Sequence, residues 1–413
     1  MARLASVPAF FGLRVLSALL LLKLSGSFLS VGEFAIFSQF MLFAALINLV
    51  AIGGVQNGLV RQAAAAGDAQ ALGRIKGAAL IIWGVALPIL IIPIALLSGE
   101  ISTVLVGARL HWMAVVIIAA LTLTAGPAQI WCSILSGRKR VASSLAAQAV
   151  GLLVGTTAAA LLITRGNAAG AVIGFATGPL ATMAVAFPFA SRLRIGRVPL
   201  TAALSEVRSL LRYSAAFAAT TGFTSITLFG LRSEYRESFG TNALGYWIAA
   251  NRISDMSTGL LGLFMIQFFV PQFEMTEGTS ARRSLVLRCW MASAAVMAIA
   301  LLAFSAASRP LVHVFLSDAY VPAIPFIRAY LTGDFLRVWV SLAMFSAFAA
   351  GRPGRYAAIE IGIIAMMAII TLALIWGGEV RAPQFGYVGA YALAAAAVTA
   401  AFFGRGFAAR AEL

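Results

Sequence analysis

The chain is poor in charged residues, in cysteine and in histidine. Only 11% of its 413 residues are charged and 61% are hydrophobic, whereas soluble domains have about 25% charged residues. The two cysteines, Cys132 and Cys289, fall near predicted cytoplasmic helix ends, so no disulfide is expected. The two histidines are too few and too far apart for a metal site. This composition excludes a soluble protein and indicates one that lies within a membrane.

Apolar runs long enough to cross a bilayer recur along the whole chain. A hydrocarbon core about 30 Å thick needs roughly 20 apolar residues per helix. Twelve such runs lie near residues 7–30, 34–60, 77–98, 111–135, 141–163, 169–190, 209–231, 244–270, 286–306, 321–349, 355–376 and 386–404. The predicted fold class is therefore an all-α, polytopic membrane protein with about 12 transmembrane helices.

Basic residues outnumber acidic ones, 30 to 14, and give a net charge of +16. If the N-terminus is cytoplasmic, nineteen Lys and Arg residues fall in inward loops. Only six fall in outward loops: Arg109, Arg165, Arg232, Arg236, Arg309 and Arg381. Membrane proteins carry such an excess in their cytoplasmic loops, so the charge reflects topology and not nucleic-acid binding. We expect a multi-pass protein of the bacterial inner membrane with both termini in the cytoplasm.

Three short motifs repeat in order at nearly constant separation. The glycines that match are Gly32 with Gly245, Gly137 with Gly351, and Gly170 with Gly386. Coincidence among abundant glycines is the alternative to a duplication. A duplication predicts an N-terminal six-helix bundle at 1–195, a cytoplasmic connecting loop at 196–212 and a C-terminal six-helix bundle at 213–413. Parallel halves of this kind usually bracket a central cavity.

Ionisable residues within the predicted spans are functional candidates, because burying a charge in a bilayer is costly. Five are basic and three are acidic: Arg14, Lys23, Arg252, Arg328 and Arg337, with Asp255, Asp334 and Glu360. Surplus cations suit an anionic cargo, and a guanidinium matches phosphate because it donates two parallel hydrogen bonds. An exporter of organic cations would instead need an unpaired carboxylate in the first helices.

Each of these charges also has a structural interpretation. Arg61, at the inner end of the second run, is either a ligand or an anchor at the membrane surface. Arg252 with Asp255, and Asp334 with Arg337, are three residues apart and share a helix face, so they are either functional or neutralised structural pairs. Lys23 lies close enough to the outer end of its helix to extend its ammonium group to the interface.

Several segments carry a family resemblance. They are the first helix around Arg14 and Lys23, Gly53 to Arg61, Ile253-Ser254-Asp255, Thr332 to Val338 and Ala357 to Glu360. With these segments the chain resembles the Wzx-type flippases of lipid-linked oligosaccharides, in the multidrug/oligosaccharidyl-lipid/polysaccharide (MOP) exporter superfamily. The O-antigen and enterobacterial-common-antigen translocases are the most similar branch. Arg252 departs from the pattern, since relatives often carry a small polar residue there.

The resemblance implies a V of two six-helix bundles and a cargo of oligosaccharide on undecaprenyl pyrophosphate, moved to the periplasmic leaflet. Under this hypothesis the substrate-binding residues are Arg14, Lys23, Arg61, Arg252 and Asn57. Asp255, Asp334, Arg337 and Glu360 form coupling sites or structural ion pairs, with proton or sodium coupling as the open question. No catalytic residue, metal or cofactor is expected. The expected partners are the glycan lipid, the bilayer, and the polymerase and ligase proteins.

Three alternatives stay open from the sequence. A multidrug antiporter shares the superfamily but should carry a carboxylate in its first helices. A lipid II flippase has a similar cargo but typically two more helices. A polysaccharide polymerase or membrane glycosyltransferase usually needs a large outward loop. Here the longest outward loop, residues 231–242, is expected to be a balanced polar cap.

Overall fold

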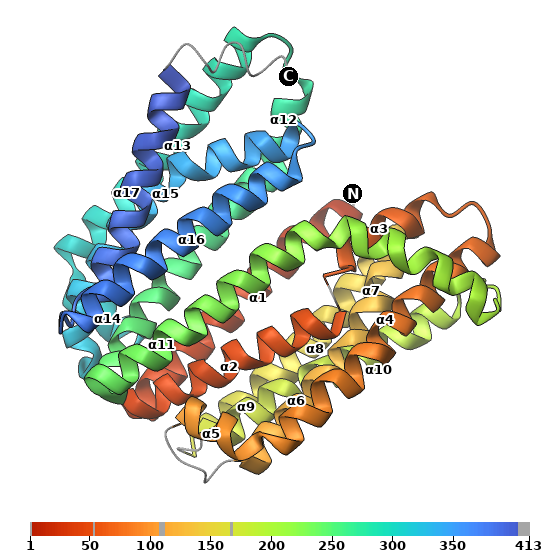
Figure 1. Ribbon diagram of the computed structural model, residues 1–413, viewed down its shortest axis with the longest axis horizontal. Helices are drawn as coiled ribbons and strands as arrows, with labels where there is room; N and C mark the ends of the chain where they lie inside the picture. Colours follow the sequence, from red (N-terminus) through yellow and green to blue (C-terminus); the bar gives the residue numbers. More distant parts are fainter. Residues whose placement is uncertain (1, 53, 107–111, 166–167, 404–413) are drawn as a thin grey trace. The chain divides into compact units, whose positions relative to one another are not determined.

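The protein is described by a computed structural model that covers residues 2–52, 54–106, 112–165 and 168–403 (Figure 1). The described residues are helical almost throughout and contain no strand. The chain divides into two compact units, residues 1–229 and 230–413, which we call unit 1 and unit 2. This division lies within a helix, seventeen residues beyond the end of the connecting loop that the sequence predicts at 196–212.

Ten helices and the start of an eleventh make up unit 1. They are α1 (Ala2–Phe28), α2 (Val31–Ile52), α3 (Gln56–Ala65), α4 (Ala69–Leu96), α5 (Ser98–Val106), α6 (Trp112–Leu123), α7 (Ala125–Gly137), α8 (Val141–Ile163), α9 (Ala168–Ala176), α10 (Gly178–Ser191) and α11 (Leu200–Phe264). Helix α8 packs against α1, α9 and α10, and α2 packs against α4 and α9. The core between them is apolar and includes Phe40, Ile118 and Leu123, each at most 2% exposed.

Unit 2 is built around α15. Its elements after α11 are η2 (Met265–Phe269), α12 (Val270–Met275), α13 (Thr279–Ala306), α14 (Ser308–Phe315), η3 (Asp318–Ala323), α15 (Ile324–Ala349), α16 (Pro353–Trp376) and α17 (Ala382–Phe403). Helix α15 packs against α13, α16 and α17 (Figure 1). Trp339 of α15 lies in the apolar core of this unit, edge-on to Trp290 of α13 and Phe402 of α17.

Nine helical segments of the described residues are long and apolar enough to cross a membrane, and each coincides with a predicted span. The other three predicted spans fall on α1 and on the two parts of α11. Several of the predicted runs are divided between elements: 34–60 between α2 and α3, 111–135 between α6 and α7, 169–190 between α9 and α10, 244–270 between α11, η2 and α12, and 321–349 between η3 and α15. The predicted all-α membrane fold is confirmed.

Helix α11 is two helices joined at Gly240. At this residue φ is 87° and ψ is 166°, a conformation that only glycine adopts readily. The structure is helical on both sides, so the predicted loop at 231–242 is largely absent. The first part of α11 also replaces most of the predicted connecting loop: only Arg192–Pro199 separate α10 from α11, and residues 200–212 are helical.

The turns after α7 and α15 have the same backbone pattern in both units. The amide of Arg140 donates to the carbonyl of Leu135, and that of Arg352 donates to Ala347, five residues back in each case. The residue just before the donor has positive φ, 61° at Lys139 and 72° at Gly351. Lys139, and not Gly137, is therefore the counterpart of Gly351, two residues from the match seen in the sequence.

Candidate functional site

The first helix of unit 1 carries two cations and, within Ala2–Phe28, no carboxylate. Arg14 of α1 is exposed and Lys23 is half-buried. The acidic residues of 1–229 all lie near helix ends: Glu33 in the first turn of α2, Asp68 at the N-cap of α4, Glu100 in the first turn of α5, and Glu206 in the second turn of α11. In unit 1 the acidic residues therefore lie near helix ends, whereas Arg14 and Lys23 lie within α1.

Local structure explains two of these carboxylates. Glu33 accepts hydrogen bonds from the amide and the hydroxyl of Ser30 at 2.8 Å each, and the Ser30 hydroxyl accepts in return from the Glu33 amide. This reciprocal cap starts α2. Asp68 accepts from the amide of Ala71 at 2.6 Å and caps α4. Both carboxylates thus stabilise helix starts.

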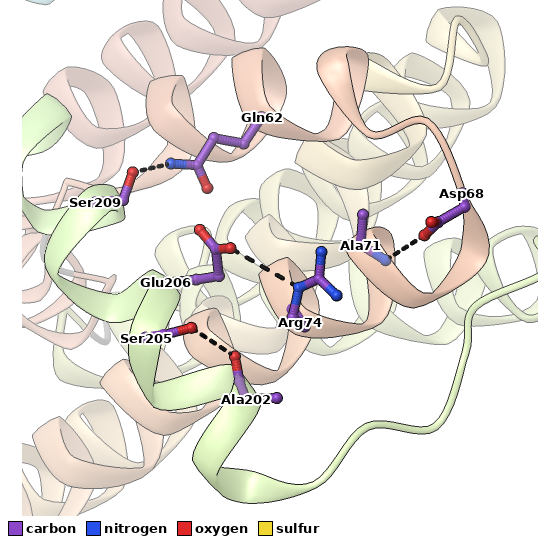
Figure 2. A network of polar contacts seen from close by, with 8 residues as sticks. All are labelled: Gln62, Asp68, Ala71, Arg74, Ala202, Ser205, Glu206 and Ser209. Carbon is purple, nitrogen blue, oxygen red and sulfur yellow. Dashed lines mark hydrogen bonds and ion pairs between the residues drawn. The ribbon is translucent and has the colours of Figure 1, made fainter.

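Arg61 lines a pocket in unit 1 of about 430 Å³ between α3, the start of α4 and the start of α11. Its lining residues are Arg61, Gln62, Ala65, Ala66, Gly67, Ala71, Ile75, Glu206 and Ser209. The Gln62 amide donates to the Ser209 hydroxyl at 2.9 Å, and the guanidinium of Arg74 lies 3.9 Å from the Glu206 carboxylate (Figure 2). Helix α11 thus contacts both α3 and α4, which lie far from it in sequence, through polar side chains.

Asp334 of α15 is the centre of a buried polar cluster in unit 2. Its side chain is fully buried and accepts hydrogen bonds from Ser254 of α11 at 2.8 Å and from Tyr387 of α17 at 2.6 Å. The ring of Tyr387 stacks on that of Tyr330, with centroids 4.3 Å apart, and Tyr330 accepts from the indole of Trp247. Three helices therefore meet at one carboxylate.

Arg337 joins this cluster through the same tyrosine. Its guanidinium donates to the Tyr387 hydroxyl at 3.4 Å and lies over the ring of Tyr391, 5.6 Å from the centroid. Glu360 of α16 interacts electrostatically with Arg337 and shares a hydrogen bond with Tyr356. Arg337 thus has an acidic residue on its own helix and another on α16, consistent with the predicted neutralised pair.

The predicted partners Arg252 and Asp255 lie in a second cluster, whose central residue is Arg232. Arg232 is only 6% exposed, donates to Asn251 at 3.0 Å and lies over the ring of Trp247. Asn251 in turn donates to the exposed Asp255 at 3.2 Å. Burial, and next the nearby charge of Arg252, lower the pKa of Arg232 to about 10.

The prediction of a polar cap at 231–242 is wrong for its first half. Arg232, Tyr235 and Arg236 are all buried, at 6%, 0% and 9% exposure. The physical reason is that this segment is helical and packs within unit 2: Tyr235 lies edge-on to Trp247 and donates to the carbonyl of Val380. The exposed residues of this segment all lie in its second half: Glu237, Ser238, Gly240 and Asn242.

The predicted site residues divide between the two units. Arg14, Lys23 and Arg61 belong to unit 1, and Arg252, Asp255, Asp334, Arg337 and Glu360 belong to unit 2. The side chain of Asn57 lies outside the described part of the chain, and so does Arg109. Arg328, which has no evident partner in the sequence, donates to the carbonyl of Ser305 and the hydroxyl of Ser308.

Sequence reasoning missed Arg232, Tyr387 and Glu206. Each is separated in sequence from the residues that it contacts. In addition, the sequence places Arg232 and Glu206 in predicted connecting loops, where charged residues are common. One signal was available for Tyr387, since it directly follows Gly386, one of the repeated glycines.

No protein-family model and no curated protein matches the chain. Solved structures do match over nearly its whole length. An inward-facing multidrug-resistance MATE-family transporter of the MOP superfamily has a TM-score of 0.70 at 14% identity, covering 94% of each chain. The lipid II flippase MurJ, in an inward closed conformation, has a TM-score of 0.77 at 11% identity, covering 94% of this chain and 86% of that one.

An outward-facing MATE-family transporter matches with a TM-score of 0.65 at 17% identity, covering 98% of this chain and 95% of that chain. The chain therefore has the all-helical fold of MOP-superfamily transporters. Within that fold it is similar both to multidrug transporters and to a flippase of a lipid-linked substrate.

Proposed function

We propose that the protein is a translocase that moves undecaprenyl-pyrophosphate-linked oligosaccharide from the cytoplasmic to the periplasmic leaflet by alternating access, for surface polysaccharide synthesis. The observation that carries the proposal is the charge of unit 1: α1 holds Arg14 and Lys23, while all four carboxylates of 1–229 lie near helix ends. A fold shared with a lipid II flippase supports the same cargo class. No bond is made or broken in this function, so no catalytic residue is required.

The cargo has a charged part and a neutral part, and they need different surroundings. Pyrophosphate is best held by guanidinium groups, which donate paired charge-assisted hydrogen bonds. Arg14 and Arg61 in unit 1 and Arg252 in unit 2 are the proposed ligands, with Lys23 and Asn57 as further candidates. The polyprenyl chain is apolar and stays in the lipid.

Substitution of Arg14 tests this proposal. In cells whose only flippase is this protein, Arg14→Ala should reduce surface glycan at least tenfold while membrane abundance stays unchanged. Arg14→Lys should keep part of the export if charge suffices and little if paired hydrogen bonds are needed. Arg165→Ala, at an exposed arginine in the turn after α8, is the matched control and should export normally. Normal export by Arg14→Ala would contradict the proposal.

A multidrug antiporter is the second candidate, because the fold is equally that of MATE-family transporters. The observation that favours it is Asp334, a buried carboxylate held by Tyr387 and Ser254. A carboxylate of this kind is able to exchange a proton for a cation. Efflux of a cationic dye that depends on Asp334, with no movement of lipid-linked glycan, would favour the antiporter.

Coupling and partners belong to the proposal as well. Asp255, Asp334 and Glu360 are the candidate carboxylates for proton or sodium coupling, and consumption of cargo outside is the alternative source of direction. Measuring flipping in proteoliposomes with and without a pH gradient tests proton coupling. A flipping rate that does not depend on the gradient would exclude it. The polymerase and ligase proteins are proposed partners, and the inner membrane with cytoplasmic termini is the proposed location.

A further inference from the structure

The pocket in unit 1 combines a cation with two side chains that can accept hydrogen bonds. Arg61 contributes the positive charge of its lining. Gln62 contributes Oε1, which is buried and has no hydrogen-bond partner among the described residues. Glu206 contributes a carboxylate whose recorded ion pair, with Arg74, is long at 3.9 Å. An unsatisfied buried acceptor is destabilising, so the pocket favours a ligand that brings hydroxyl donors.

Figure 2 shows how these acceptors face the same space. The Gln62 amide extends from α3 and the Glu206 carboxylate from α11, and both point into the gap between the two helices. Ser209, also of α11, already receives the hydrogen bond from the Gln62 nitrogen at 2.9 Å. The amide is therefore oriented with its oxygen left for another donor.

The start of α4 does not compete as an anion site. Asp68 caps this helix and accepts from the Ala71 amide at 2.6 Å, so a carboxylate already occupies the first turn. A negatively charged ligand in the pocket is thus held by Arg61 and kept away from the α4 terminus and from Glu206. The pocket has one end suited to an anion and another suited to hydroxyl groups.

We propose that this pocket binds the phosphate–sugar junction of the cargo, with Arg61 on the phosphate and Gln62 and Glu206 on hydroxyls of the first sugar. The inference rests on the proposed function, and it identifies the pocket as the site where the cargo first binds. A volume of about 430 Å³ is in the range of small-ligand pockets and is ample for a sugar phosphate. The bulk of the glycan and the lipid tail would lie outside the pocket.

A ligand in this pocket would also contact the start of α11, the helix through which the chain passes from unit 1 to unit 2. Gly196, in the connection before α11, donates its amide to the carbonyl of Ala69 at 2.7 Å, and Glu206 and Ser209 follow within the first three turns of α11. A sugar that bridges Gln62 and Glu206 would add a contact between α3 and α11. Loading is therefore expected to hold this segment against unit 1.

Binding of soluble probes to the purified full-length protein tests the inference. The probes are a hexose 1-phosphate, glycerol 1-phosphate and inorganic phosphate, followed by calorimetry. The hexose phosphate should bind at least fivefold more tightly than the other two. Equal binding of glycerol 1-phosphate would identify a phospholipid headgroup site and overturn the assignment, and equal binding of inorganic phosphate would leave no role for the sugar.

Two substitutions of similar volume test the sugar end separately. Gln62→Met should weaken hexose phosphate binding about fivefold to tenfold and leave phosphate binding unchanged, whereas Arg61→Ala should weaken both. Glu206→Gln should also weaken hexose phosphate binding, but it should not weaken phosphate binding, because it removes a negative charge from the pocket. Gln70→Met, at an exposed glutamine of α4, is the matched control and should bind like the parent. Because Glu206 is partly exposed, Glu206→Gln keeps the test valid if Gln62→Met does not fold. Unchanged hexose phosphate binding in folded Glu206→Gln would overturn the inference.

The outcomes separate this inference from the function on which it rests. If Arg14→Ala abolishes export and the probes do not bind, the flippase stands and the pocket assignment falls. If the hexose phosphate binds as expected and export is indifferent to Arg14, the pocket assignment stands and the proposed function falls.

Discussion

Among single residues, Arg232 is the most unusual charge in unit 2. It is buried beside Trp247, near the like charge of Arg252, and burial together with that charge lowers its pKa to about 10. A lowered pKa for a cation means that the folded state disfavours the charged form. Below pH 10 the charge of Arg232 therefore lowers the free energy of unfolding.

Arg232→Met is expected to raise the free energy of unfolding at pH 7.5 by about 1–3 kcal/mol, because it removes a buried charge and fills the same space. The gain should shrink as pH rises above about 10, because the parent side chain loses its proton in the folded state at a lower pH than in the unfolded state. Thermal unfolding in detergent at pH 7.5 and 10.5 measures both effects. Arg309→Met, at an exposed arginine of α14, should change little, and a less stable Arg232→Met would contradict this account.

The two aspartates of unit 2 should differ in the same assay. Asp334 is fully buried and accepts from Ser254 and Tyr387, whereas Asp255 is exposed and has a recorded bond from Asn251. Asp334→Asn should lower the free energy of unfolding by about 1–3 kcal/mol, since it removes one charged acceptor from a buried network. Asp255→Asn should stay within about 0.5 kcal/mol of the parent. Equal effects would show that burial does not distinguish them.

Among helices, the packing of α15 on α17 depends on a glycine. A Cβ at Gly333 would lie 2.4 Å from Cδ1 of the Tyr387 ring, closer than any real contact. Gly333→Ala should therefore displace the ring that hydrogen-bonds Asp334 and destabilise the protein by about 1–3 kcal/mol. Gly362→Ala is the matched control, because a Cβ there meets nothing within 4 Å and alanine favours a helix. The account fails if the two variants unfold at the same temperature.

The helices themselves were largely predictable from the sequence, because a bilayer requires long apolar runs and the chain supplies them. The breaks between α2 and α3 and within α11 were less predictable. They depend on backbone conformations at Gly54 and Gly240, two of many glycines with no distinguishing neighbour. The 196–212 segment reads as a polar loop, yet its residues from Leu200 onward are helical because Ala203 and Leu210 pack against unit 1.

The candidate site was predictable only where its partners are close in sequence. Three-residue spacing predicted that Asp334 and Arg337 share a face, and both contact Tyr387. It could not predict Tyr387 itself, or that Asn251 and Arg232 accompany Asp255. Those contacts join residues of different helices or turns, which a single sequence does not reveal.

For the whole molecule, the fold alone does not distinguish the two proposed functions. MATE-family transporters and the lipid II flippase are both similar to this chain over most of its length. The choice between them therefore rests on where the charges lie: cations in α1, and carboxylates of unit 1 held near helix ends. We therefore expect transport of an anionic lipid and poor transport of organic cations.

The most direct test reconstitutes the purified protein in proteoliposomes and follows two substrates in parallel, a labelled undecaprenyl pyrophosphate oligosaccharide and a cationic dye. The account predicts glycan-lipid flipping at least tenfold above protein-free vesicles, a return to that background with Arg14→Ala, and no dye accumulation. Dye transport without glycan-lipid flipping would contradict it.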